Sequence, residues 1–136
     1  MKRLLCLCLV LTGFSALATD WYADADHGND LWDGTSSAFV SGTIGPKKTL
    51  QAALDIEGLK SGDTLWLLPG DYNDGAADSC RGLVTVSGLK VKSTDGADVT
   101  FVTGASGTRC VGIDESATGV ILDGLTLRNG GAGAGN

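Results

Sequence analysis

Histidine is almost absent from this chain of 136 residues, and with it the groupings that many catalytic and metal sites need. His27 is the single histidine, so no Zn²⁺ site of paired histidines and cysteines is expected. A Ser-His-Asp triad would have to use His27, and nothing in the sequence places a serine beside it. The residues present therefore favour a chain without a catalytic site of its own, and they leave open whether a longer protein is an enzyme.

Positive charge is also scarce. The chain has 10 Lys and Arg against 16 Asp and Glu, which gives a formal net charge of −6. Such a chain is not expected to bind nucleic acid or an anionic membrane through its overall charge. After residue 18 no apolar run approaches the roughly 20 residues that a membrane-spanning helix requires, so no span is expected there.

The one apolar run lies at the amino terminus. Lys2 and Arg3 precede LLCLCLVLTGFSALA, and Ala16-Leu17-Ala18 supplies the small-x-small pattern that a signal peptidase cleaves. A membrane anchor is the alternative, but the run is short and is interrupted by polar residues. Residues 1–18 are therefore predicted to be a signal peptide cleaved after Ala18, and the mature protein is expected in the periplasm, on the cell surface or outside the cell.

Cysteine is limited to two residues in the predicted mature chain, because Cys6 and Cys8 belong to the signal. The remaining pair is Cys80 and Cys110. An even pair in an oxidising compartment favours a disulfide. Two separate buried thiols are the alternative.

A single helix is predicted over residues 46–57. Leu50, Ala53 and Leu54 recur at the spacing that places them on one face, and Gly58 is suited to end the helix. The segment 46–58 is therefore expected to pack through an apolar face.

Short strands are predicted on both sides of this helix. A polar leading segment, residues 19–45, contains one at 21–23. Later strands are expected at 64–68, 83–87, 89–92, 99–102, 110–113, 120–122 and 125–127, each bounded by turn-forming residues. An antiparallel sandwich or barrel and a solenoid both fit this pattern. The absence of well-matched hairpins favours the solenoid, followed by a glycine-rich loop or linker at 131–136.

Four segments resemble secreted right-handed parallel β-helix proteins of the pectate-lyase-like fold. WDGTS at 32–36, PKKTLQAALD at 46–55 and SGDTLWLLPGDY at 61–72 resemble the opening of such proteins, and GVILDGLTLRNG at 119–130 resembles one of their coils. The resemblance implies an all-β, right-handed parallel β-helix with its first coils in residues 59–130 and a capping helix over one end. Because stacked repeats need about three or more units, a truncated fragment is expected, with further coils or a partner at the carboxyl-terminal end.

The resemblance leaves function open, because the same fold serves polysaccharide lyases, glycoside hydrolases, autotransporter passengers and adhesins. One hypothesis is an exported or cell-surface module for adhesion or glycan contact, with a polysaccharide or surface glycan as its partner. The alternative is the non-catalytic amino-terminal part of a polysaccharide lyase or glycoside hydrolase whose catalytic residues follow residue 136. No lyase or hydrolase motif is recognisable, which favours the first hypothesis.

Two sets of residues are candidate binding sites. Asp24, Asp26, Asp30 and Asp33 lie close together in the sequence and offer the oxygen ligands that Ca²⁺ prefers, although they depart from the EF-hand pattern. A solvated loop of turn-forming residues is the alternative.

Trp32 and Trp66 are candidates for stacking on the apolar faces of sugar rings; packing of the amino-terminal cap is the alternative. Because strand side chains alternate, Trp66 should point outward if Leu65 and Leu67 point inward.

Overall fold

A computed structural model describes residues 17–75 and 79–131, and this part of the chain is mostly β. Most of the predicted signal peptide and the end of the glycine-rich segment, residues 1–16 and 132–136, lie outside the described residues. The elements, in chain order, are β1 (Asp20–Ala23), α1 (Leu50–Leu54), β2 (Thr64–Leu67), β3 (Gly70–Tyr72), β4 (Cys80–Val84), β5 (Lys90–Ser93), β6 (Thr100–Thr103), β7 (Arg109–Ile113), β8 (Ile121–Asp123) and β9 (Thr126–Arg128).

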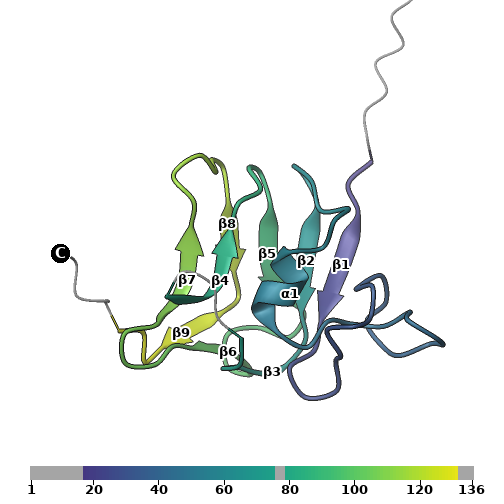
Figure 1. Ribbon diagram of the computed structural model, residues 1–136, viewed down its shortest axis with the longest axis horizontal. Coiled ribbons are helices and arrows are strands. Elements are labelled where there is room, and N and C mark those ends of the chain that lie inside the picture. Colours follow the sequence, from purple (N-terminus) through teal and green to yellow (C-terminus); the bar gives the residue numbers. More distant parts are fainter. Residues whose placement is uncertain (1–16, 76–78, 132–136) are drawn as a thin grey trace, which may run out of the picture.

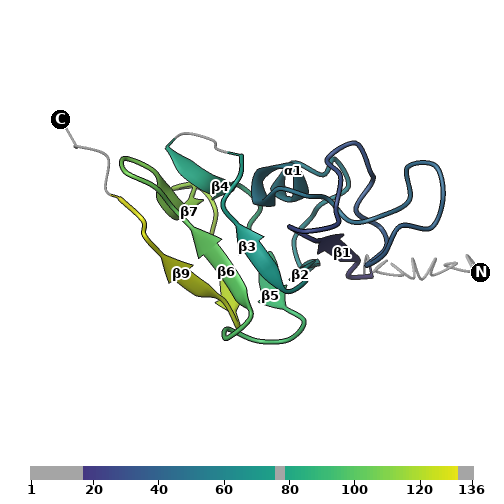
Figure 2. The same ribbon diagram turned by 90° about the horizontal axis from the view of Figure 1, so that it is seen from below.

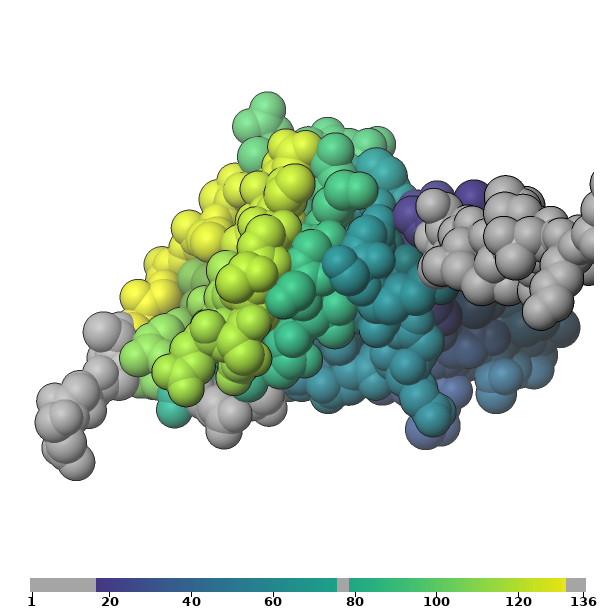
Figure 3. Space-filling view, turned by 90° about the horizontal axis from the view of Figure 1, so that it is seen from above, coloured from purple at the N-terminus to yellow at the C-terminus, as the bar shows by residue number. Residues whose placement is uncertain are grey.

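The strands form three parallel sheets, with the orders β1-β2-β5-β8, β3-β6-β9 and β4-β7. The chain visits the three sheets in a repeating order: β2, β3 and β4 are followed by β5, β6 and β7, and then by β8 and β9 (Figure 1). Figure 2 shows β3, β6 and β9 side by side, and Figure 3 shows successive parts of the chain as neighbouring bands from teal to yellow. The antiparallel alternative is wrong, because every pairing between these strands is parallel.

Parallel register places apolar side chains of neighbouring strands in the same core. Leu65 of β2 pairs with Val91 of β5, and Tyr72 of β3 pairs with Val102 of β6. All four side chains are buried and belong to one hydrophobic cluster, which also includes the buried apolar residues of α1. Alternation along each strand therefore sends one set of side chains into this cluster and leaves the other set on the outer face.

The helix is shorter than the predicted span of 46–57. It covers Leu50–Leu54, with Thr49 as the N-cap residue, whose side chain accepts from the backbone N–H of Ala52. Lys47 cannot join the helix because its backbone is extended and bridges Ala23 at the end of β1. Asp55 is the C-cap, so the prediction that Gly58 ends the helix is also wrong.

The predicted apolar face of the helix is confirmed. Leu50, Ala53 and Leu54 are all buried. A Cβ added to Gly82 of β4 would lie 2.7 Å from both Leu50 Cγ and Leu54 Cδ1, so the missing side chain of Gly82 makes room for the helix. The helix packs directly on β4, which pairs with β7 on its other side.

Two strand predictions need correction. The strand expected at 83–87 is β4, and it begins earlier, because Cys80 and Gly82 pair with the β7 residues Arg109 and Val111. Strand β3 was not predicted, because the strand expected at 64–68 stops at the turn-forming pair Pro69-Gly70. Gly70 adopts φ +149°, and the chain resumes pairing at once through Gly70 and Thr100.

Candidate functional site

A row of outward side chains crosses the sheet β1-β2-β5-β8. Tyr22 pairs with Trp66, Trp66 pairs with Lys92, and Lys92 pairs with Asp123, each on the next strand of the sheet. Leu65 and Leu67, the neighbours of Trp66 along β2, are both 0 % exposed. The expectation that Trp66 points outward is therefore confirmed, and parallel pairing brings Tyr22 next to it.

The indole of Trp66 is held in place from both sides. Its Nε1 donates a 3.0 Å hydrogen bond to Asp20 Oδ1, and Lys92 Nζ lies 5.8 Å from the ring centroid. Lys92 Nζ is also 3.0 Å from Asp123 Oδ2, so its charge is paired on the side away from β2. An aromatic ring fixed by polar neighbours loses little conformational entropy when a ligand stacks on it.

A shallow concavity of about 330 Å³ lies at this row, and Asp20, Tyr22, Trp66 and Thr94 line it. Two aromatic side chains supply apolar surface, and a carboxylate and a hydroxyl supply hydrogen-bonding groups. Sugars present such a mixture of apolar faces and hydroxyls. The aromatic row, which we define as Asp20, Tyr22, Trp66 and Lys92, is therefore chemically suited to contact a saccharide.

Trp32, the other predicted stacking residue, packs against residues of its own segment of the chain. Its ring stacks on Phe39 with centroids 4.9 Å apart, and a Cβ added to Gly45 would lie 2.5 Å from its Cε3 atom. Trp32 therefore packs within the long segment between β1 and α1. The structure does not bring it into the aromatic row.

The four candidate calcium ligands are not brought together. In residues 17–75 and 79–131 no group of three or more His, Cys, Asp or Glu side chains is placed to hold a metal ion. Asp24 Oδ1 accepts from the backbone N–H groups of Asp26 and His27, both at 2.9 Å. Asp30 Oδ1 accepts from the N–H groups of Lys48 and Thr49. These carboxylates hold turns and the start of the helix.

Asp33 has a similar local role. Its Oδ1 accepts from both the backbone N–H and the hydroxyl of Thr35. The backbone N–H of Thr35 holds the pKa of Asp33 below its ordinary value. The polar loop alternative to the calcium site thus describes Asp24, Asp30 and Asp33 well.

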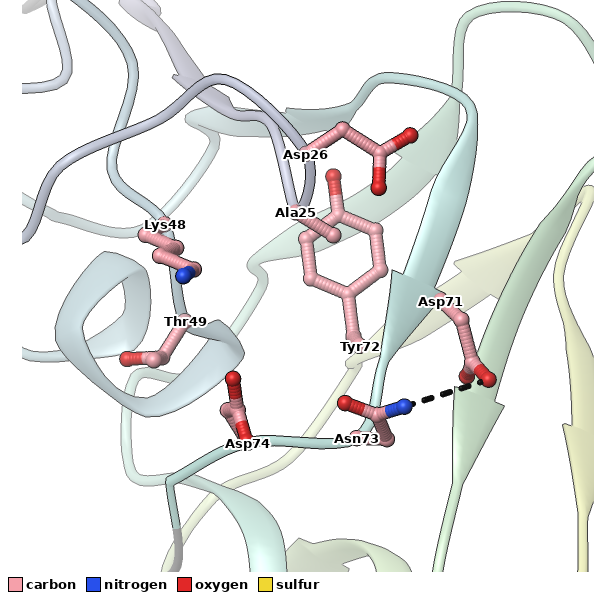
Figure 4. A pocket seen from close by; sticks show the side chains of 8 residues that line it. All are labelled: Ala25, Asp26, Lys48, Thr49, Asp71, Tyr72, Asn73 and Asp74. Atoms are coloured by element: carbon pink, nitrogen blue, oxygen red, sulfur yellow. Dashed lines mark hydrogen bonds between the residues drawn. The ribbon is translucent and has the colours of Figure 1, made fainter.

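Asp26 instead lines a separate cavity of about 180 Å³ next to β3 and the start of α1 (Figure 4). Asp71, Asp74 and Lys48 also line it. The Tyr72 hydroxyl lies within hydrogen-bond distance of the Ala23 carbonyl, at 2.8 Å, and of the Leu68 carbonyl, at 3.0 Å. Burial of the ring, and then the charge of Asp24, raise the pKa of Tyr72, so this hydroxyl remains a neutral structural donor.

A second outward cluster crosses β3, β6 and β9; no motif in the sequence indicates it, because it depends on the register of the three strands. Arg128 donates from Nη2 to Asp71 Oδ2 at 2.9 Å and from Nε to Thr103 Oγ1 at 2.9 Å, while its guanidinium lies 4.1 Å from the Phe101 ring centroid. Thr103 also donates to the second oxygen of Asp71. The donors and acceptors of this cluster largely satisfy one another, so it stabilises the outer face of the sheet.

The predicted disulfide is not formed. Cys80 and Cys110 are both buried, at 2 % and 9 % exposed, but the register sets Arg109, and not Cys110, opposite Cys80. Cys110 Sγ instead donates to the Arg128 carbonyl at 3.2 Å. The alternative of two buried thiols describes this pair.

His27 is largely exposed, with its Nδ1 3.4 Å from Asp24 Oδ2.

Within the described residues no helix is long and apolar enough to cross a membrane. No protein-family model matches the chain, and neither the curated proteins nor the solved structures include a match to it.

Proposed function

We propose that this chain is an exported or cell-surface module that begins a right-handed parallel β-helix and contacts glycans through the aromatic row. The observation that carries the binding part of the proposal is the in-register pair of outward aromatic residues, Tyr22 and Trp66. Trp66 is anchored by Asp20 and lies at a concavity that a sugar ring can enter.

The repeating strand order supports the β-helix. In the two complete circuits of the chain, β2-β3-β4 and β5-β6-β7, each of the three sheets receives one strand, and neighbouring strands within each sheet pair in parallel. The helix lies at one end of this stack, where its apolar face covers β4. A stack of parallel circuits needs such a cover, because its terminal core would otherwise face water.

The opposite end of the stack supports the expectation of further coils or a partner. Strands β8 and β9 are edge strands of their sheets, and Leu122 and Leu127, which pair with the buried Val91 and Val102, are 36 % and 49 % exposed. A further parallel strand in the same register would pair the backbone N–H and C=O groups of the open edge and would bury these apolar side chains. We therefore expect a continuing coil of the same kind at this edge.

Export is supported by the signal-like amino-terminal sequence. A surface module that meets glycans does not need a catalytic group, which fits the hydrogen-bonded state of the carboxylates described above. The same surface would also suit a targeting segment of a carbohydrate-active enzyme.

Binding to a panel of polysaccharides and oligosaccharides tests the proposal, with tryptophan fluorescence and calorimetry as readouts. We expect at least one glycan to bind, and Trp66→Ala to weaken that binding by about tenfold or more, as loss of a stacked aromatic anchor does. Trp32→Ala is the matched control, because Trp32 packs on Phe39 away from the row. Equal binding by the Trp66→Ala variant, or no binding across the panel, would reject glycan contact at this row.

A further inference from the structure

A buried carboxylate lies at the amino end of β1. Asp63 is 0 % exposed. Its Oδ1 accepts a hydrogen bond from the Thr19 backbone nitrogen at 2.8 Å. Its Oδ2 accepts from Trp21 Nε1 and from the backbone nitrogen of Lys60, both at 3.0 Å.

These donors are neutral groups. Across residues 17–75 and 79–131, no ion pair within 4.0 Å reaches the Asp63 carboxylate. A buried negative charge gains most from a positive charge in direct contact, because the local dielectric constant is low. A cationic partner in place of one neutral donor would therefore strengthen this site.

Thr19 is the donor whose charge can change. The fold holds both of its backbone groups, because its N–H donates to Asp63 and its carbonyl accepts from the Thr64 N–H at 3.0 Å. The two preceding residues, Leu17 and Ala18, are exposed. The backbone hydrogen bonds that lead into β1 thus begin at Thr19, the residue directly after the predicted cleavage site.

We infer that cleavage after Ala18 creates an ion pair between the new α-ammonium group of Thr19 and the buried carboxylate of Asp63, and that this pair stabilises the exported form relative to the precursor. The inference rests on the proposed export. A signal peptidase would supply the hydrolysis: one water breaks the Ala18–Thr19 amide, its oxygen leaves with Ala18 as a carboxylate, and the Thr19 nitrogen takes both protons of the water and becomes –NH₃⁺. That nitrogen already lies 2.8 Å from Asp63 Oδ1, so the donor gains charge without a change of position.

The consequence is a fold whose stability depends on processing. The Asp63 carboxylate is charged in both forms, and the ammonium group adds a Coulombic attraction that the neutral amide N–H does not supply. A precursor would keep the weaker amide donor and unfold more readily. In the processed chain the ion pair would stabilise β1, the edge strand of the sheet β1-β2-β5-β8.

The test compares chains that begin at Thr19 with chains that begin at Ala18, both lacking the signal. We expect the folding equilibrium constant, measured by urea unfolding at pH 6.5, to be about tenfold larger for the Thr19 chain, because the added positive charge attracts the Asp63 carboxylate at close range. Acetylation of the Thr19 amine should remove the gain. Equal stability of the Thr19 and Ala18 chains would overturn the inference.

Asp63→Asn, made in both chains, completes the cycle. The isosteric amide retains an acceptor oxygen, and the difference between the two chains should vanish. If the Asn variants do not fold, the acetylated and unmodified Thr19 chains still decide the question. Amino-terminal sequencing of the secreted protein separately locates the cleavage, so a failure of the export proposal is distinguishable from a failure of the ion pair.

Discussion

The side-chain oxygen of Gln51 accepts a hydrogen bond from the backbone N–H of Leu83 at 2.8 Å. Gln51 lies in α1 and Leu83 in β4, on the side of β4 that does not pair with β7. The glutamine thus supplies the acceptor that a carbonyl of a neighbouring strand would otherwise provide. A five-residue helix therefore both covers the apolar core and ends the hydrogen-bonded edge of a sheet.

Gln51→Ala should lower the free energy of unfolding by about 1–2 kcal/mol, because it leaves a half-buried N–H without an acceptor. Chemical denaturation measures the change. Asp55→Ala is the comparison, since Asp55 accepts from Gln51 Nε2 at 2.8 Å and its loss leaves the Leu83 bond in place. A larger loss for the Asp55 variant than for the Gln51 variant would contradict the bridging role.

Leu54→Asp should destabilise the fold by about 3 kcal/mol or more and promote aggregation, because it buries an unpaired charge against β4. Leu54 is 5 % exposed, whereas Leu31 is 82 % exposed. Leu31→Asp is therefore a matched control and should change stability by less than about 0.5 kcal/mol. Size-exclusion chromatography and thermal melts check both variants, and a monomeric Leu54→Asp protein of normal stability would rule out the covering role of the helix.

Thiol labelling should find both Cys80 and Cys110 reactive in the unfolded, unreduced protein and protected in the native protein. Protection is expected because both side chains are buried. Mass spectrometry counts the added labels. A complete lack of labelling after unfolding would restore the disulfide expected from the sequence.

Asp63 should make the stability depend on acid pH. Burial opposes its ionisation, but hydrogen bonds from Trp21, Thr19 and Lys60 and the Lys60 charge together lower the pKa of Asp63 below its ordinary value of 3.8. A lowered pKa in the folded state contributes stability above the ordinary value, and this contribution is lost as pH falls through the folded pKa. Unfolding measured from pH 7 to pH 2 should therefore lose stability below about pH 4.

Asp63→Asn should make that acid loss shallower, while Asp114→Asn should retain the Asp63 contribution. Asp114 is a useful comparison because hydrogen bonds from the side chain and the backbone of Ser116 lower its pKa at a position that is not buried. An identical acid profile for the wild-type protein and the Asp63→Asn variant would show that this carboxylate does not contribute to the pH dependence of stability.

The sequence could predict the features that depend on local periodicity. The helix face, the short strands and the outward direction of Trp66 all follow from spacing along the chain, and the structure confirms them. Helix length could not be predicted, because Lys47 is held extended by pairing with Ala23, a residue far away in sequence. The early start of β4 likewise depends on its pairing with β7.

The candidate site shows the same limit. Composition pointed to calcium because Asp24, Asp30 and Asp33 are neighbours in sequence, yet each carboxylate accepts hydrogen bonds from nearby backbone or side-chain groups. The neighbour that matters to Trp66 is Tyr22, which lies on another strand. Such a relation requires the register of the sheet, and local sequence patterns do not contain it.

Successive circuits of the chain differ in length although their strands stay aligned. Thr64 pairs with Lys90 and Lys90 pairs with Ile121, so the second interval is longer than the first. In the sheet β3-β6-β9 the first interval is the longer one, because Gly70 pairs with Thr100 whereas Phe101 pairs with Thr126. The turns absorb these differences, which makes the exposed turn around Glu115 a suitable place to graft a peptide or a second binding loop without disturbing the strands that carry Trp66.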